Sequence, residues 1–277
     1  MATGTAVRAP VRERRPGGRK PLLRRERPLS LLHQSIGNGL TVIQAPAGCG
    51  KTALAMQFAD ELDFSVAWVA LDSACASPEV FAERLARVLA GPAFPAPVTA
   101  ARLSDLFSYL GNALQERVDA SEQPLLIVLD NVQELGAEAD ASAMLEWLVV
   151  ALPEDAELLL CSREPFQAPT VNRRLVAGEA VLVGKEALAF TLDEIRALID
   201  LREAAASPEH VLEASAGWAM GVLALLGGSA RAASGLGDAW RNYLTQELWG
   251  PLPADLRELI QPLGLCETVS SEIGRAH

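Results

Sequence analysis

Short apolar runs alternate with longer amphipathic stretches along the chain from residue 40 to residue 185. The runs are four or five residues long and rich in β-branched or large aliphatic side chains, as in strands that helices cover on both faces. In the longer stretches apolar residues recur every three or four positions, which indicates one apolar face of a helix. The alternation predicts an α/β fold with a largely parallel sheet flanked by helices. The predicted strands are 40–44, 65–69, 125–129, 157–161 and 180–183, and the predicted helices are about 51–62, 78–90, 101–119 and 140–151.

The strand pattern stops after residue 185, and helical signals replace it. Thr191 and Glu194 have the spacing of a capping box, which opens a helix. Ser207-Pro208 indicates the start of a second helix, and residues 219–226 indicate a third. We therefore expect an α/β domain over residues 28–185 and a helical lid subdomain over residues 186–249.

The composition is that of a globular protein. Half of the 277 residues are hydrophobic and 21% are charged, which excludes wholesale disorder. The longest uncharged stretch, residues 214–230, is interrupted by glycine and serine and is too short for a membrane-spanning helix. No apolar run of a secretory signal follows the basic N-terminal residues, so we expect a cytoplasmic protein with no membrane partner. The four cysteines lack the paired spacing of a metal site, which indicates free thiols.

Charge is distributed unevenly along the chain. Between Arg8 and Arg27 nine basic residues stand against two acidic ones, whereas the whole chain carries a net charge of −11. Because this segment is rich in arginine, proline and glycine, we predict a basic flexible tail over residues 1–27. Its role stays open between a solvated leader and contacts with phosphates or an anionic surface. The acidic body argues against a nucleic-acid-binding surface in the rest of the chain.

Residues 45–52, Ala-Pro-Ala-Gly-Cys-Gly-Lys-Thr, follow the first predicted strand and precede a helix-forming stretch. The pattern is that of a phosphate-binding P-loop with alanine in place of the first glycine. Its two glycines let the backbone curl so that consecutive N–H groups face a polyphosphate, and the helix dipole adds positive charge. Lys51 is expected to reach the β- and γ-phosphates, and Thr52 to offer its hydroxyl to Mg²⁺. The expected nucleotide-binding residues are Ala45, Pro46, Ala47, Gly48, Cys49, Gly50, Lys51, Thr52 and Ala53.

Asp130 directly follows the predicted strand 125–129 and is the expected second ligand of the magnesium ion. A nucleotide-bound Mg²⁺ needs a carboxylate at the end of a neighbouring strand, and Asp130 supplies one within the same alternating pattern. The next residue is Asn131, where P-loop enzymes that hydrolyse ATP often place a second acid that positions the attacking water. Slow hydrolysis, or binding without hydrolysis, is therefore expected.

Arg163 follows the next predicted strand, 157–161, and is expected to sense the γ-phosphate; a solvent-exposed loop arginine is the alternative interpretation. Cys49 is either a filler residue or an oxidisable thiol whose pKa is lowered by the N–H groups of the loop and by Lys51. Trp218 is interpreted as a core anchor of the helical subdomain. The expected catalytic residues are thus Lys51, Asp130 and Arg163, and the expected magnesium ligands are Thr52 and Asp130.

These residues resemble the signal-transducing ATPases with numerous domains (STAND), and specifically the nucleotide-binding part of the large LuxR-type, MalT-like transcriptional regulators. The similarity covers roughly residues 21–270. Two positions depart from the family's pattern: Asn131 replaces a second acid, and Ala219 replaces a proline expected near the adenine. The motifs that carry the resemblance are 45–52, Trp68 with Leu71-Asp72, Leu188-Ala189-Phe190-Thr191, Ala216-Gly217-Trp218 and the winged-helix entry at 252–257.

The resemblance implies a P-loop NTPase fold of the AAA+ and STAND kind, followed by a helical lid and by the start of a winged helix at residues 250–272. It also implies a switch that binds ATP or ADP with Mg²⁺. ADP would hold a closed monomer, whereas ATP and an unknown inducer would allow self-association. Promoter DNA would be bound only through a C-terminal helix-turn-helix domain missing from this sequence. Residues 273–277 match the translation of a common sequencing adapter and are expected to be an artefact.

Two other interpretations of the P-loop stay open. One is a different P-loop ATPase or a kinase, such as a transposition-type ATPase, which does not act as a transcriptional switch. No motif supplies the acceptor base that a kinase would need. The other is a nucleotide-binding scaffold that never hydrolyses ATP, which Asn131 would suit.

Overall fold

The computed structural model describes residues 22–96, 102–136, 139–231, 245, 249–250 and 254–263. Within them a single sheet of five parallel strands runs in the order β2-β3-β4-β1-β5. The predicted α/β fold with a parallel sheet is therefore confirmed. The strands are β1 (Leu40–Gln44), β2 (Ser65–Ala70), β3 (Leu125–Asp130), β4 (Ala156–Ser162) and β5 (Val181–Val183).

The sheet is covered on both faces, which explains the almost continuous apolar runs of its strands. In β3, Leu126 and Val128 belong to the core on one face, whereas Leu125, Ile127 and Leu129 belong to the core on the other. Successive side chains of a strand point to opposite faces, so both sets must be apolar where both faces are buried.

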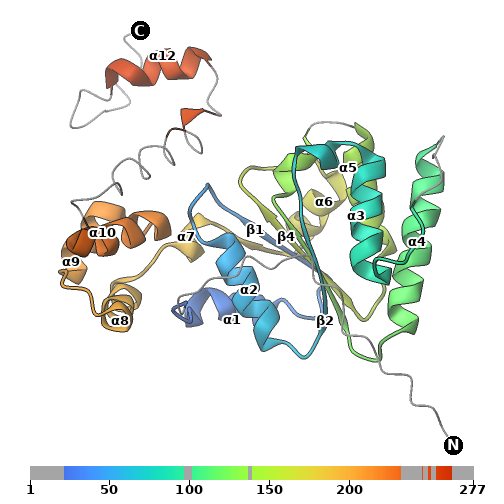
Figure 1. The fold of residues 1–277 in the computed structure, drawn as a ribbon, viewed down its shortest axis with the longest axis horizontal. Coiled ribbons are helices and arrows are strands. Elements are labelled where there is room, and N and C mark those ends of the chain that lie inside the picture. Colours follow the sequence, from blue (N-terminus) through green and yellow to red (C-terminus); the bar gives the residue numbers. More distant parts are fainter. Residues whose placement is uncertain are drawn as a thin grey trace, which may run out of the picture.

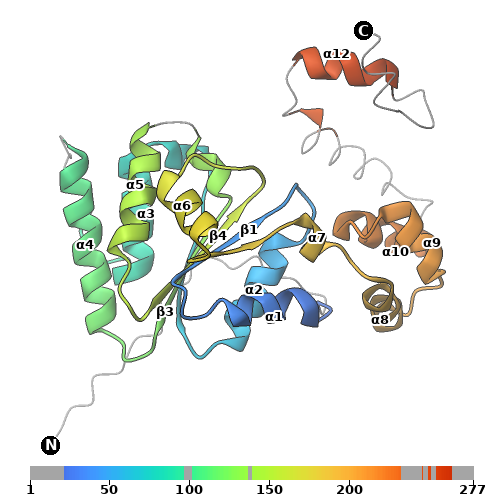
Figure 2. The same ribbon diagram turned by 180° about the vertical axis from the view of Figure 1, so that it is seen from behind.

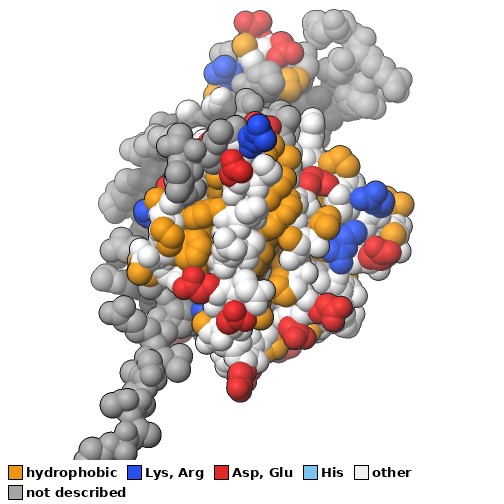
Figure 3. Space-filling view, turned by 90° about the vertical axis from the view of Figure 1, so that its right-hand side faces the viewer, with side chains coloured by type: hydrophobic (Ala, Val, Ile, Leu, Met, Phe, Trp, Pro, Cys, Tyr) orange, Lys and Arg blue, Asp and Glu red, His pale blue; other side chains and the backbone are white. Residues whose placement is uncertain are grey.

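Helices form a layer on each face of the sheet (Figure 1). Two helices, α1 (Glu26–Gln34) and α2 (Lys51–Glu61), supply apolar residues to one core. The opposite core is closed by four helices, as the reverse view in Figure 2 also shows. Seen from the α4 side, the surface carries bands of apolar side chains among acidic and basic ones (Figure 3). The four helices of this layer are α3 (Pro78–Ala90), α4 (Leu103–Asp119), α5 (Ala139–Ala151) and α6 (Pro169–Ala177), and the short turns are η1 (Ser73–Ala76) and η2 (Val132–Leu135).

A helical lid follows the sheet through the short helix α7 (Lys185–Leu188). The predicted capping box is present, because Thr191 accepts a hydrogen bond from the N–H of Glu194 and the Glu194 carboxylate accepts one from the N–H of Thr191. The lid has a core of its own, which includes Ile195, Leu198 and Val222. Its helices are α8 (Leu192–Arg202), α9 (Pro208–Ser215) and α10 (Ala219–Arg231).

The prediction of a flexible tail is wrong for its last part. Leu23 packs against the lid core, and Arg25 is only 7% exposed. Composition predicted solvation here, but lid carbonyls and a carboxylate supply the partners that a buried arginine needs. Residues 1–21 and 273–277 lie outside the described residues. Of the winged-helix segment, the described residues include the helix α12 (Ala254–Leu263), and the domain boundaries remain predictions.

No helix in the described part of the chain is both long and apolar enough to cross a membrane.

Candidate functional site

The P-loop connects the end of β1 to the first turn of α2. Gly48 and Gly50 have positive φ angles of 72° and 88°, a region that side chains with a Cβ rarely adopt. Gly50 is the residue immediately before α2. The two glycines therefore let the loop turn sharply into the amino end of the helix.

Four successive carbonyl oxygens of this loop are held by donors. Lys51 Nζ donates to the carbonyls of Ala45 and Pro46 over 2.7 and 3.1 Å. The indole N–H of Trp218 donates to the carbonyl of Ala47, and the backbone N–H of Met220 donates to that of Gly48, each over 3.0 Å. In a trans peptide the N–H points away from the C=O of the same unit. The N–H groups of residues 47–49 therefore point away from these donors, as an anion-binding loop requires.

The hydroxyl of Thr52 and the carboxylate of Asp130 meet at the carboxyl ends of the strands. Thr52 Oγ1 donates to Asp130 Oδ2 over 2.8 Å, and the N–H of Asn131 donates to the other carboxylate oxygen over 3.0 Å. Burial raises the pKa of Asp130 against the opposing effect of these two hydrogen bonds. A hydroxyl beside a carboxylate is an oxygen pair of the kind that Mg²⁺ prefers.

Lys51 is buried beside this pair. Burial lowers the pKa of its ammonium, the positive charge of Arg163 lowers it further, and the charge of Asp130 opposes the shift. Two cations and one carboxylate thus lie within electrostatic range of one another. A polyphosphate bound in this pocket would add negative charge beside these two cations, which favours its binding.

Arg163 follows β4, the strand between β1 and β3. It lines a pocket of about 450 Å³ together with P-loop residues, Asn131 and Met220 of the lid. The N–H of Arg163 donates to Oε1 of Gln133, a residue that the sequence pattern did not single out. The predicted residues Lys51, Thr52 and Arg163 thus line one pocket, and Asp130 touches it through Thr52.

A second pocket of about 380 Å³ lies on the other side of the P-loop. Pro46 and Cys49 form one wall, α7 forms another, and the lid turn that includes Trp218 forms the third. Ala219 lines both pockets, so the two are neighbours. The lining is mainly apolar, which suits a flat aromatic group.

The interpretation of Trp218 needs correction, and the structure separates the two interpretations of Cys49. Trp218 packs against the core that α1 and α2 share, and its indole reaches the P-loop rather than anchoring the lid core alone. Burial raises the pKa of the Cys49 thiol and outweighs the opposing charge of Lys51. The raised pKa favours the interpretation of Cys49 as a filler residue of the loop over that of an oxidisable thiol.

The residues present fit a nucleoside polyphosphate with Mg²⁺. The P-loop offers outward N–H groups and a lysine, Thr52 and Asp130 offer oxygen ligands, and the apolar second pocket offers a place for a base. Ala45 and Ala53 complete the predicted set: Ala45 is buried in the core below the loop, and Ala53 lines the larger pocket.

Comparison with known proteins agrees with this geometry. A family model described as an AAA domain matches residues 35–162. The transcriptional regulator MalT of Serratia proteamaculans is 31% identical over 183 residues, 64% of this chain and 20% of MalT. MalT of Cronobacter sakazakii is 31% identical over 224 residues, 76% of this chain and 24% of that protein. The serine/threonine-protein kinase PknK of Mycobacterium tuberculosis is 24% identical over 279 residues, 92% of this chain and 25% of PknK. The chain thus spans about a quarter or less of the length of these relatives.

Solved structures share the fold at low identity. The STAND protein with a tetratricopeptide repeat sensor from Pyrococcus horikoshii matches with a TM-score of 0.52 and 17% identity, covering 91% of this chain and 36% of that one. The Orc1 protein of Aeropyrum pernix, solved in complex with DNA, matches with a TM-score of 0.51 and 17% identity, covering 90% and 73%. The solved structures show the shared fold, and the AAA domain match and the MalT relatives together show that the chain is a P-loop ATPase module related to MalT.

Proposed function

We propose that this chain is the ATP/ADP-binding switch module of a LuxR/MalT-like transcriptional regulator. The observation that carries the proposal is the meeting of three elements at one pocket. The P-loop offers Lys51, β3 brings Asp130 to Thr52, and the lid reaches the P-loop carbonyls through Trp218 and Met220. A nucleotide held by the loop would therefore also touch the lid, which is the condition for a switch.

Each residue has a separate role in this proposal. The N–H groups of residues 47–49 and Lys51 would bind the phosphates, and Arg163 would contact the γ-phosphate from β4. Thr52 and Asp130 would hold Mg²⁺, which supplies charge neutralisation between the phosphates when it is bound. The second pocket, walled by Pro46 and Trp218, would take the base.

Hydrolysis is proposed to be slow or absent. Asn131 lines the phosphate pocket at the position where a second acid would activate water. An amide cannot accept a proton from water at neutral pH, so the general-base contribution of a carboxylate is missing. The bound nucleotide would then persist long enough to define a state of the switch.

We extend the proposal to the regulator of which this chain would be one module. By likeness to MalT, whose name describes an HTH-type transcriptional regulator, we propose cytoplasmic action on promoter DNA through a domain outside this sequence. Self-association in the ATP state and an unidentified inducer belong to the same proposal.

Calorimetric titration with ADP and ATP in the presence of Mg²⁺ tests the central step. Binding of both nucleotides, with ADP detected by mass spectrometry after denaturation of the purified protein, is the expected result. No heat from either nucleotide, on protein that circular dichroism shows to be folded, would overturn the proposal.

A kinase or other P-loop ATPase is the second candidate, since the PknK match extends over most of this chain. Labelled ATP separates the two: slow release of phosphate to water supports the switch, and Lys51-dependent transfer to an added acceptor supports the kinase.

A further inference from the structure

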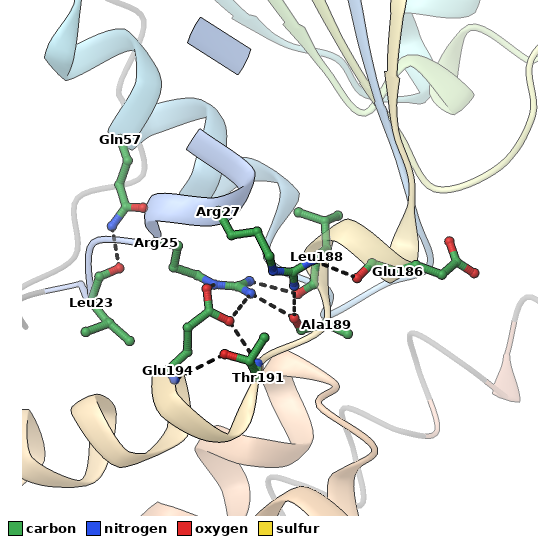
Figure 4. A network of polar contacts seen from close by, with 9 residues as sticks. All are labelled: Leu23, Arg25, Arg27, Gln57, Glu186, Leu188, Ala189, Thr191 and Glu194. Atoms are coloured by element: carbon green, nitrogen blue, oxygen red, sulfur yellow. Dashed lines mark hydrogen bonds and ion pairs between the residues drawn. The ribbon is translucent and has the colours of Figure 1, made fainter. Parts of the chain in front are cut away.

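Arg25 joins three parts of the molecule that are far apart in sequence. It precedes α1, which packs on the sheet, and its guanidinium points into the linker between the sheet and the lid (Figure 4). Nη1 donates to the carbonyl of Leu188 over 2.8 Å, and Nη2 donates to that of Ala189 over 3.0 Å. The same guanidinium forms a two-pronged ion pair with Glu194 of α8, over 2.9 and 3.2 Å.

This clasp, defined as Arg25 with its partners Leu188, Ala189 and Glu194, is almost closed to solvent. Arg25 is 7% exposed, and its guanidinium carbon lies 3.9 Å from the ring centre of Phe190. Planar guanidinium groups suit such a combination of carboxylate pairing and aromatic stacking. A lysine offers one point charge and cannot reach all these partners together.

The neighbouring residues tie the clasp to the P-loop domain. Leu23 packs against the lid core while its carbonyl accepts a hydrogen bond from Gln57 of α2 over 2.7 Å. Arg27 adds a second donor to the Ala189 carbonyl at 2.6 Å. The segment 23–27 therefore lies between α2 and the lid and contacts both.

A chain of backbone contacts leads from the clasp to the phosphate-binding loop. The N–H of Phe190 donates to the carbonyl of Gly217 over 2.8 Å. The next residues, Trp218 and Met220, donate to the carbonyls of Ala47 and Gly48. Phe190, whose ring stacks on Arg25, thus holds the lid turn at Gly217, next to the two residues that donate to the P-loop carbonyls.

We propose that Arg25 is a positioning residue that holds the lid against the P-loop and thereby slows the release of bound nucleotide. The claim that Arg25 slows nucleotide release rests on the proposed function, whereas the claim that Arg25 holds the lid does not. Loss of the guanidinium frees the Leu188–Ala189 turn, and α10 then leaves the loop more often.

The test compares Arg25→Gln with Arg24→Gln. Arg24 is the adjacent arginine, exposed and paired with Glu61 of α2, so its substitution removes the same charge from the same segment without touching the clasp. Hydrogen exchange without nucleotide measures how often the lid turn opens. We expect the amides at 218–222 to exchange at least about tenfold faster in Arg25→Gln, with the exchange rates of α4 and α5 unchanged. The release rate of a fluorescent ADP analogue, chased with ADP, should rise by a similar factor in the same variant. Arg25→Lys should restore only part of both effects.

The two measurements separate the clasp from the proposed function. Equal exchange rates at 218–222 in Arg25→Gln and Arg24→Gln would overturn the proposal that Arg25 holds the lid, even if ADP binds. Failure of the unsubstituted protein to bind the analogue would overturn the nucleotide proposal, and exchange would still decide whether Arg25 holds the lid. If Arg25→Gln does not fold, Glu194→Gln decides instead, because an amide oxygen can still accept from the N–H of Thr191 while the charge is lost.

Discussion

Lys51 is a buried ammonium whose partners are backbone carbonyls rather than a carboxylate. Carbonyl oxygens carry only partial charge, so they leave much of the lysine charge uncompensated. Burial lowers the pKa of this ammonium. A phosphate oxygen is a stronger partner for this group, so we expect Lys51 to contribute strongly to nucleotide binding.

We expect Lys51→Ala to weaken ADP binding by a factor of ten or more. One buried charge-assisted contact contributes about 1.5–3 kcal/mol, which corresponds to that factor. Calorimetry with Mg²⁺ and ADP measures it. Arg87→Ala on α3 removes a charge of the same sign from an exposed site and should leave the affinity unchanged. Equal affinities for all three proteins would exclude Lys51 from the site.

The raised pKa of Asp130 determines how the stability of the metal-free fold depends on pH. Its raised pKa means that the folded chain holds the proton more tightly than the unfolded chain, so the ionised form destabilises the metal-free fold above that pKa. This penalty disappears as the pH falls and the carboxyl is protonated in both states. We expect Asp130→Asn to raise the melting temperature of the metal-free protein at pH 7 and to abolish the Mg²⁺ dependence of nucleotide binding.

Asp72 provides a control, because its pKa is shifted in the direction opposite to that of Asp130. The hydrogen bond from Arg84 lowers the pKa of Asp72, so Asp72→Asn should lower the melting temperature at pH 7 and leave Mg²⁺ dependence intact. Thermal denaturation followed from pH 4 to pH 8 compares the three proteins. A lower melting temperature for Asp130→Asn at neutral pH would contradict a destabilising role for the ionised carboxylate.

Asn131 has a left-handed backbone, with φ of 62° and ψ of 47°. Asparagine and aspartate tolerate this region better than longer side chains do. We therefore expect Asn131→Asp, rather than Asn131→Glu, to introduce a water-activating carboxylate at little cost. Phosphate release should rise by at least about tenfold, since a general base contributes about 10²–10⁴. An unchanged rate with unchanged ATP affinity would show that position 131 does not face the attacking water.

Residues whose roles follow from local spacing could be predicted from the sequence, whereas residues that act across the fold could not. The P-loop and Asp130 have fixed positions relative to a strand end. Gln133 and Arg25 reach their partners through side chains that span other elements. Their neighbours along the chain give no sign of these contacts. The Arg25 contact forms only where α1 packs beside the linker to the lid, and the Gln133 contact forms only where η2 lies beside the end of β4.

At the scale of elements, Gly217 governs how closely the lid turn approaches the linker. A Cβ there would lie 2.6 Å from the carbonyl oxygen of Phe190, and the φ angle is +75°. We expect Gly217→Ala to force the turn away from Phe190, to lower stability and to speed ADP release. Gly178→Ala is the matched control: its φ is +74°, but nothing lies within 4 Å of the added Cβ.

The Gly178 variant isolates the backbone strain, which costs roughly 1–2 kcal/mol for a residue in this region. Any further loss of stability in Gly217→Ala results from the contact between the added Cβ and the carbonyl oxygen of Phe190. Thermal denaturation and stopped-flow release of a fluorescent ADP analogue measure both effects. Equal behaviour of the two variants would mean that the lid turn yields without disturbing the loop.

Strands with continuous apolar runs and helices with a broad apolar face were predicted from the sequence, whereas helices that bury only a few residues were not. The five strands and the helix at 78–90 were predicted close to their observed bounds. In α1 only Pro28, Leu29 and Leu32 are buried, and in α6 only Val171 is. Such short helices are stabilised by packing on the sheet rather than by their own pattern, so sequence periodicity alone could not predict them.

At the scale of the whole molecule, the proposed nucleotide site lies between two units with separate cores. One unit is the sheet with its two helical layers, and the other is the lid with its core around Ile195 and Val222. Hydrogen bonds from Trp218 and Met220 join the lid to the P-loop. A ligand that contacts both units adds to these bonds, so it should stabilise their association more than either unit alone.

We therefore expect Mg²⁺-ADP to raise the melting temperature of the protein and to protect the lid from exchange at the same time. At a free ligand concentration of 100 times Kd the stabilisation is about 2.7 kcal/mol, or roughly 5–10 °C for a chain of this size. Scanning calorimetry with and without ADP measures the shift, and Lys51→Ala at the same ADP concentration should show a much smaller one. If ADP stabilises the sheet but leaves exchange at 218–222 unchanged, the nucleotide binds the P-loop without engaging the lid. The module would then bind nucleotide without transmitting its presence, because nothing would distinguish the loaded lid from the empty one.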